Sequence, residues 1–388
     1  MTFVSSVGRD LPVVQSEAAR NYGLDLCRFI AILLVVAAHT LDQLFGALPA
    51  FPRFYVLTGW IGVELFFSLS GFLIGRILLD TVERGLTGAS LSSFLARRWL
   101  RTLPAYFATL VLLCLAYHKV DGASFLLIQP FVHDSPNLMP VSWSLVMEEY
   151  FYLLFPLCIA GLAWWGPRLC RRRPVECVTL AVICLLPALR YVALDQRWPF
   201  SDYTFHAHPL MRLDCCAYGV LAACLQRRFP DRIARLCRAC PAWVVAAVAV
   251  GLARLWCGVF EVMDDGALML RLGMQYWGPV YFALQGAMLN ALAAVVVLYA
   301  SYKAAAPFRL ADAPVRMVSR LSYSLYLVHS SLTAFALVMT GIGQMGWLAL
   351  PVMSAVIVAA AGLLHVLVEM PFLALRDRYV PARPRSDR

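Results

Sequence analysis

Charged residues are scarce in this sequence. Only 14% of its 388 residues are Asp, Glu, Lys or Arg, whereas 61% are hydrophobic and the mean hydropathy is +0.71. Soluble domains carry about 25% charged residues, so the composition predicts an all-α, polytopic membrane protein embedded in a lipid bilayer. The net charge of +10 does not indicate a nucleic-acid partner, because the basic residues are sorted between alternating loops.

Other common features are missing as well. The 12 cysteines lack the spacing of a zinc site or a disulfide scaffold, and those inside apolar runs, such as Cys114 and Cys184, act as small hydrophobic residues. We therefore expect no metal ion and no permanently bound cofactor. Residues 1–23 contain no cleavable signal pattern, and the chain has no internal repeat or low-complexity segment.

Long apolar runs occupy most of the chain. A helix needs about 20 apolar residues to cross the roughly 30 Å hydrocarbon core of a bilayer. The sequence predicts about ten transmembrane helices, at 26–46, 57–79, 103–118, 143–165, 176–194, 210–226, 241–260, 279–302, 321–340 and 347–370. Of these, 103–118 and 210–226 are short, and Pro371 is expected to end the last helix.

Arginine residues are unevenly distributed between the loops. One set of alternate loops carries basic clusters, whereas each opposite loop holds at most one basic residue. By the positive-inside rule, both termini are cytoplasmic. The sequence thus predicts a cytoplasmic segment at 1–23, a membrane-embedded core at 24–371 and a basic cytoplasmic tail at 372–388.

The first apolar run, LDLCRFIAILLVVAAHT, combines a histidine with a charged pair. Arg28 and His39 are 11 positions apart, so on a helix they lie on nearly the same face, about 16 Å apart along the axis. Asp25 lies one turn before Arg28 and is placed to pair with it. Such groups are costly in a membrane unless they line a polar cavity. We interpret this helix as one wall of a catalytic cavity, with His39 as a general base; a structural histidine is the alternative.

A second polar stretch, WSLVMEEYFYLLFP, opens the fourth predicted span. Ser144, Glu148 and Tyr152 recur every four residues and share one helix face. Glu148 is interpreted as a carboxylate that orients His39 or shuttles a proton. Glu149 points away from this face and is interpreted as an interfacial carboxylate beside an aromatic belt.

The third stretch, FLARRWLRTLPAYF, is rich in arginine. Arg97, Arg98 and Arg101 offer planar donors at the cytoplasmic entrance of a span, which suits a phosphorylated ligand. The alternative is an ordinary stop-transfer cluster.

Three further polar residues lie in or near later spans. Arg212 and Asp214 open the sixth span, and His329 shares a helix face with Ser322 and Tyr326 in the ninth. All three are additional site candidates. Glu64, within GVELFFSLSGFLI, receives no predicted role.

Together, these stretches resemble the acyltransferase type 3 family of bacterial integral-membrane O-acyltransferases. The opening Arg-x10-His signature, GVELFFSLSGFLIGRIL, the RRxxRxxPxY element, WSLVMEEYFY and SYSLYLVH occur in order between Leu24 and about Arg378. The resemblance implies a ten-helix core in the bacterial cytoplasmic (inner) membrane, here without the extracytoplasmic SGNH-type domain of some members. It also implies transfer of an acyl group, usually acetyl, from cytoplasmic acyl-CoA to a hydroxyl of a saccharide or other acceptor.

Carried over residue by residue, the resemblance makes His39 the catalytic histidine and Arg28 its motif partner. Glu148, with Ser144 and Tyr152, matches the Ser-Leu-Glu-Tyr motif, and Arg97, Arg98 and Arg101 match the basic element at the donor end. His39 could act as the general base or as a transient acyl carrier.

Two rival classes of protein remain open at this point. A transporter or flippase would use the same polar stripe for moving a substrate, although the sequence shows no inverted repeat. A membrane sensor or scaffold would not need His39 and Glu148 in one cavity.

Overall fold

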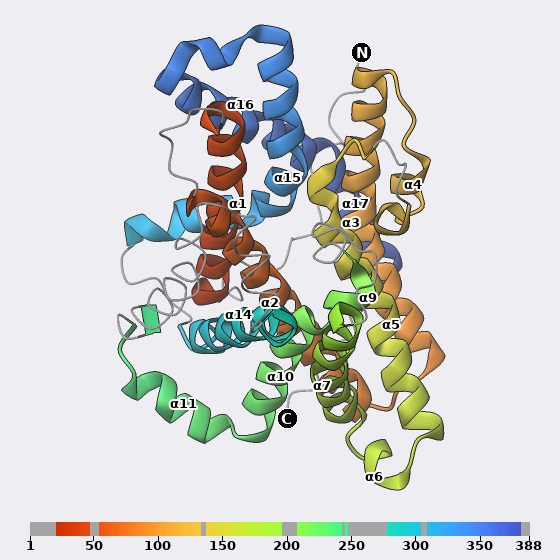
Figure 1. Cartoon of the computed structure of the whole chain (residues 1–388). Coiled ribbons are helices and arrows are strands. Elements are labelled where there is room, and N and C mark those ends of the chain that lie inside the picture. Colours follow the sequence, from red (N-terminus) through yellow and green to blue (C-terminus); the bar gives the residue numbers. More distant parts are fainter. Residues whose placement is uncertain are drawn as a thin grey trace, which may run out of the picture.

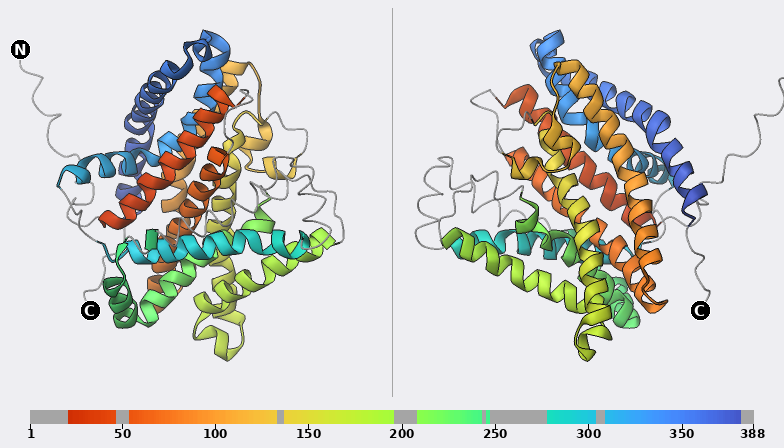
Figure 2. Two further views of the ribbon diagram at one scale, coloured as in Figure 1. Left: turned by 60° about the vertical axis from the view of Figure 1, so that its left-hand side comes forward. Right: turned by 90° about the vertical axis from the view of Figure 1, so that its right-hand side faces the viewer.

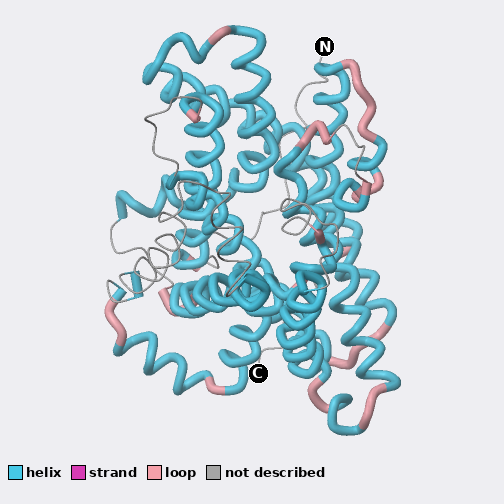
Figure 3. The backbone as a smooth tube through the Cα atoms, viewed as in Figure 1, coloured by secondary structure: helices cyan, strands magenta, loops and turns pink. Residues whose placement is uncertain are grey.

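The computed structural model describes residues 21–46, 54–132, 137–195, 208–242, 245–246, 278–303 and 309–381. In these segments all regular structure is helical (Figures 1 and 3), which confirms the predicted all-α class. Among the described residues, seven helical segments are long and apolar enough to cross a membrane: Tyr22–Phe45, Thr58–Glu83, Gly88–Tyr117, Pro140–Trp165, Pro174–Val192, Asp312–Thr340 and Ile342–Tyr379.

The helices are numbered in the order in which they occur along the chain. Those relevant to the site are α1 (Tyr22–Phe45), α2 (Phe54–Glu83), α3 (Gly88–Tyr117), α5 (Trp143–Trp165), α7 (Pro174–Asp195), α9 (Pro209–Arg212), α10 (Asp214–Arg228), α14 (Gly278–Ala300), α15 (Arg309–Thr340), α16 (Ala349–Leu364) and α17 (Met370–Tyr379). Shorter helices are α4 (Gly122–Phe125), α6 (Arg168–Arg171) and α11 (Pro230–Ala239), and 3₁₀ turns cover Gln129–Phe131, Pro140–Ser142 and Ile342–Leu348.

Ten spans were expected, and seven of them correspond to the segments found. The range 241–260 lies almost entirely outside the described residues. The range 210–226 becomes α9 and α10; α10 has 15 residues and ends in Arg227 and Arg228, so at 1.5 Å per residue it is too short for a bilayer core. Of α14, the described apolar part is Gly286–Ala300, and Figure 2 shows this helix lying crosswise to α1.

The last helix does not end at Pro371 as predicted. A π-helical turn, His365–Glu369, joins α16 to α17, and the chain stays helical to Tyr379. Pro371 follows the π-helical turn directly, so the residue that lacks a backbone N–H lies where the hydrogen-bond spacing of the continuous helix is already widened.

Close backbone approaches hold the helices together around α2. A Cβ added at Gly71 would lie 1.8 Å from the carbonyl oxygen of Cys216, and one added at Gly219 would lie 2.0 Å from that of Ser68. Only glycine fits at these two positions of the α2–α10 crossing, which is the use of small residues expected between membrane helices.

The start of α1 is fixed by the segment that follows α14. The Asn21 side chain caps α1 by accepting from the Leu24 N–H (3.1 Å) and donates to the Ser301 carbonyl (2.7 Å), while the Gly23 N–H donates to the Lys303 carbonyl (2.8 Å). These bonds satisfy N–H groups that a helix start leaves open. They also set the direction of the helix that carries His39.

Candidate active site

Helices α1 and α15 run parallel, and their polar faces pack against each other along a line of contacts that is called the α1–α15 seam below. The Ser319 hydroxyl donates to Asp25 Oδ1 (2.8 Å) at one end, and the Gln43 side chain donates to the Ser330 hydroxyl (3.0 Å) at the other. Between these ends, the rings of His39 and His329 meet edge to face with centroids 5.0 Å apart. The structure thus brings two predicted site histidines together.

The His39 ring is held by its own helix. Its Nδ1 lies 2.9 Å from the Val35 carbonyl oxygen, which can only accept a hydrogen bond, so Nδ1 carries the proton. Nε2 therefore holds a lone pair, and it has no hydrogen-bond partner within the described part of the chain. Gly59 of α2 packs beside this part of α1, since a Cβ added there would lie 3.0 Å from the Ala38 Cβ and 4.0 Å from His39 Cε1.

His329 repeats this arrangement in a fully buried position. Its Nδ1 lies 2.8 Å from the Tyr326 carbonyl and 3.2 Å from the Leu325 carbonyl. Its Nε2 is buried with no partner among the described residues. Two imidazoles in the same tautomer thus lie in contact on facing helices.

Tyr326 connects the histidine pair to the start of α5. Its ring centroid lies 5.6 Å from that of His329. Its hydroxyl donates to the Val141 carbonyl (2.7 Å) and accepts from the Ser144 hydroxyl (2.5 Å). Ser144, predicted as a site residue, therefore contacts the histidine pair through Tyr326.

Glu148 lies in a second polar group further along α5. Tyr152 donates to its carboxylate (2.6 Å), Ser70 donates to the Tyr152 hydroxyl (2.7 Å), and the Arg98 guanidinium lies 5.5 Å from the centre of the Tyr152 ring. Glu148 and Tyr152 share a helix face, as their spacing predicts. The carboxylate does not hold the His39 ring, however, because Val35 does so.

Glu149 was interpreted as an interfacial carboxylate, and this interpretation is wrong. The residue is only 5% exposed, and the Thr102 hydroxyl of α3 donates to its Oε1 (2.7 Å). Its Oε2 has no partner among the described residues. The helix face that Glu149 occupies is covered by α3, a packing that the sequence of α5 alone does not reveal.

The predicted pair of Asp25 and Arg28 is present at 2.9 Å. Asp25 is buried, and it also accepts from Ser319 on α15. The pair therefore lies at the opposite end of the seam from His39, where it joins the two helices.

The three arginines of α3 have different surroundings. Arg97 donates to Asp377 (3.1 Å) and to the Val380 carbonyl at the end of α17. Arg98 packs over the rings of Phe94 and Tyr152, whereas Arg101 is exposed. Two of the three cations are thus engaged by the protein itself.

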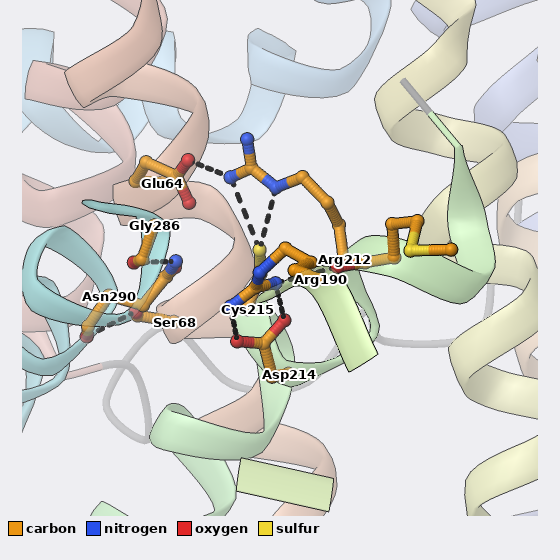
Figure 4. Close-up of polar contacts among 9 residues, drawn as sticks. Glu64, Ser68, Arg190, Arg212, Asp214, Cys215, Gly286 and Asn290 are labelled. Atoms are coloured by element: carbon orange, nitrogen blue, oxygen red, sulfur yellow. Dashed lines mark hydrogen bonds and ion pairs between the residues drawn. The ribbon is translucent and has the colours of Figure 1, made fainter. Parts of the chain in front are cut away.

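Arg212 and Asp214 take part in two buried ion pairs, shown in Figure 4, that join α2 to α9 and α7 to α10. Arg212 pairs with Glu64 and donates to the Cys215 sulfur (3.2 Å), while Arg190 donates through both terminal nitrogens to Asp214, each at 2.7 Å. Sequence reasoning assigned no role to Glu64 and missed Arg190. A lone arginine inside the apolar run 176–194 was the available signal, since such a charge requires a partner.

The arrangement can perform acid–base chemistry on a hydroxyl group. A neutral imidazole with a free Nε2 can take a proton from a hydroxyl or attack a carbonyl carbon. Among the described residues, no group of three or more His, Cys, Asp or Glu side chains is placed to hold a metal ion.

Comparisons with known proteins agree with this chemistry. The chain is 26% identical over 401 residues to Acyltransferase MdmB of Streptomyces mycarofaciens, covering 93% of each chain. It is 27% identical over 171 residues to Peptidoglycan O-acetyltransferase OatA of Listeria monocytogenes, and 31% identical over 162 residues to a putative O-acetyltransferase of Staphylococcus aureus.

The last two matches cover 38% and 36% of this chain but only 26% and 25% of the relatives, so the chain spans about a quarter of their length. No solved structure matches. The family model described as an acyltransferase domain matches residues 21–366, which favours acyl transfer over the transporter and scaffold alternatives. The chain therefore belongs to the acyltransferase 3 family.

Proposed function

We propose that this enzyme moves an acetyl group from cytoplasmic acyl-CoA to a hydroxyl group of a saccharide or cell-envelope glycan. The observation that carries the proposal is the free Nε2 of His39, whose lone pair is fixed by the bond between Nδ1 and Val35. A relative whose printed name is peptidoglycan O-acetyltransferase supports a glycan acceptor.

In the direct version of the reaction, His39 acts as a general base. Nε2 takes the proton of the acceptor hydroxyl while its oxygen attacks the thioester carbonyl. The carbon–sulfur bond then breaks, and the CoA thiolate receives the proton from Nε2. The products are the O-acyl ester and CoA, and no other reactant is needed.

In the alternative version, Nε2 attacks the thioester itself. CoA leaves with a proton supplied by the medium, and the acyl-imidazolium then passes its acyl group to the acceptor oxygen, whose hydroxyl proton returns to the medium while His39 is restored to its neutral form. The edge-to-face contact with His329 and the Tyr326–Ser144 link position the ring in either version.

The Arg-rich ends of the helices are proposed to face the cytoplasm, as the positive-inside rule requires. The core at 24–371 then carries the reaction in the bacterial inner membrane, with the segments 1–23 and 372–388 on the cytoplasmic side. The donor approaches from the end of the seam that holds Asp25, Arg28 and Arg101. The acceptor approaches from the end that holds Gln43.

The proposal is tested with inverted and right-side-out vesicles and radiolabelled acetyl-CoA. Wild-type protein should release CoA and label envelope glycans, and His39→Ala should lower both to background because no base remains. His39→Gln, which keeps a polar side chain, should be equally inactive. Full activity of a folded His39→Ala protein would overturn the proposal, and fluorescence-detected size-exclusion chromatography checks the fold.

A further inference from the structure

The short helix α11 begins where the membrane-spanning part of α2 ends. Arg227, at the end of α10, donates to Glu83 (2.8 Å) and pairs with Asp80, both in the last turn of α2. Because α2 is a candidate membrane span up to Glu83, Arg227 lies level with one end of a span, and α11 starts three residues later. Figure 1 shows α11 leading away from the end of α10 at the edge of the molecule. With 10 residues it is about 15 Å long, too short to cross a bilayer. The helix therefore lies at the boundary between membrane and water.

Arginine side chains dominate the surface of α11. Four of them, in the helix or directly before it, are exposed: Arg228, Arg232, Arg235 and Arg238. None of the four forms an ion pair within the described part of the chain, and the helix itself contains one acidic residue, Asp231. The guanidinium groups of Arg228 and Arg232 lie 5.5 and 5.8 Å from the centre of the Phe229 ring. The helix thus carries positive charge that its surroundings do not neutralise.

Apolar side chains are exposed beside these cations. Leu236 is 65% exposed and Phe229 is 37% exposed, whereas Cys237 is buried. At 100° per residue, Arg232 and Arg235 lie about 140–160° around the helix from Cys237, so both point away from the protein. Leu236 lies only about 40° from Arg232. Exposed cations next to exposed apolar side chains are typical of a helix that lies in the plane of a membrane interface.

The position of α11 is coupled to the helix that carries His39. The Tyr299 hydroxyl of α14 donates to the Cys240 carbonyl directly after α11 (3.0 Å), and the Tyr302 hydroxyl donates to the Pro230 carbonyl at its start (3.5 Å). The same segment at the end of α14 accepts the hydrogen bonds that fix the start of α1. A ligand that holds α11 in place therefore stabilises the contact between α14 and α1.

We propose that α11 binds the anionic headgroups of phospholipids in the leaflet that it borders. The arginines donate charge-assisted hydrogen bonds to the lipid phosphate oxygens, while Leu236 and Phe229 insert among the upper carbons of the acyl chains. A soluble acidic partner would use the charge but would leave these two apolar side chains in water. The inference does not depend on the acyl-transfer reaction, because it rests on the surface and contacts of α11 alone.

The test follows thermal unfolding of the purified full-length protein in neutral detergent, titrated with phosphatidylglycerol or phosphatidylcholine. A ligand that binds the folded state raises the melting temperature, so phosphatidylglycerol should stabilise the wild type more than phosphatidylcholine does. Arg232→Gln/Arg235→Gln should need at least about tenfold more phosphatidylglycerol for the same rise, because two cations near the lipid surface are lost. Arg172→Gln/Arg173→Gln, at exposed positions beside α6, removes the same charge and should behave like wild type.

Two further variants separate charge from apolar contact. Arg232→Lys/Arg235→Lys keeps the charge and should keep most of the effect, whereas Leu236→Ser should weaken it. These variants also test the proposal if the glutamine variant does not fold in phosphatidylcholine.

Unchanged phosphatidylglycerol dependence in the α11 variants would overturn the proposal, as would an equal loss in the α6 control. The titration is repeated with sn-glycerol 3-phosphate, which carries the phosphate without acyl chains. If it stabilised the protein as strongly as phosphatidylglycerol, the helix would bind a free anion and the proposal would fail.

Discussion

At the scale of single residues, the site depends on a few polar side chains, each held by a specific hydrogen-bond partner. The carbonyl groups of Val35 and Tyr326 fix the protonated nitrogen of His39 and His329. The Nε2 atoms then keep the lone pairs that can accept a proton or attack a carbonyl carbon. The sequence identified both histidines, but their contact with each other depends on how α1 packs against α15.

The buried pair of Glu64 and Arg212 yields a prediction about stability. Glu64→Gln should lower the free energy of unfolding by about 3–5 kcal/mol, because it leaves the Arg212 cation buried without its carboxylate. Thermal unfolding in detergent, followed by tryptophan fluorescence, measures the change.

Glu83→Gln is the matched control. Glu83 pairs with Arg227 at the surface, and an exposed pair contributes less than about 1 kcal/mol. If both variants melted together with wild type, the Glu64 pair would not have the stabilising role that its burial indicates.

At the scale of elements, the α2–α10 crossing decides where the polar groups lie. Gly219 and Gly71 bring the two backbones into contact, which in turn brings Glu64 of α2 within reach of Arg212. The glycines are visible in the sequence, but the partner helix of each is not.

Gly219→Ala should therefore destabilise the protein, since the new methyl group would lie 2.0 Å from the Ser68 carbonyl oxygen. Overpacking of this kind costs about 1–3 kcal/mol. Gly161→Ala in α5 is the control: nothing lies within 4 Å of its added Cβ, and alanine is the better helix former by up to about 1 kcal/mol. Size-exclusion profiles after stepwise heating compare the two, and equal melting temperatures would contradict the prediction.

At the scale of the whole molecule, charge asymmetry predicts the orientation. Clustered arginines occupy alternate loops, so a green fluorescent protein fused after residue 388 should fluoresce, and an alkaline phosphatase fused there should be inactive. A phosphatase inserted at Val120, in the opposite loop after α3, should be active. An active phosphatase at residue 388 would place the C-terminus outside and reverse the proposed donor side.

The sequence by itself determined the all-α membrane class, the acyltransferase family and the main chemical groups. It could do so because apolar run length, helical spacing and short motifs are local properties. Arg28, Asp25 and the pair of Glu148 and Tyr152 lie as their spacing predicts, since residues three or four positions apart meet on any helix.

Only the tertiary structure decided which polar groups meet across helices. It separated Glu148 from the hydrogen bond that holds His39, buried Glu149 against Thr102, engaged Arg97 with α17 and joined α11 to the end of α14. The physical reason is that each of these contacts joins segments far apart in the chain. Their partners are chosen by helix packing, which a periodic pattern on one helix does not specify.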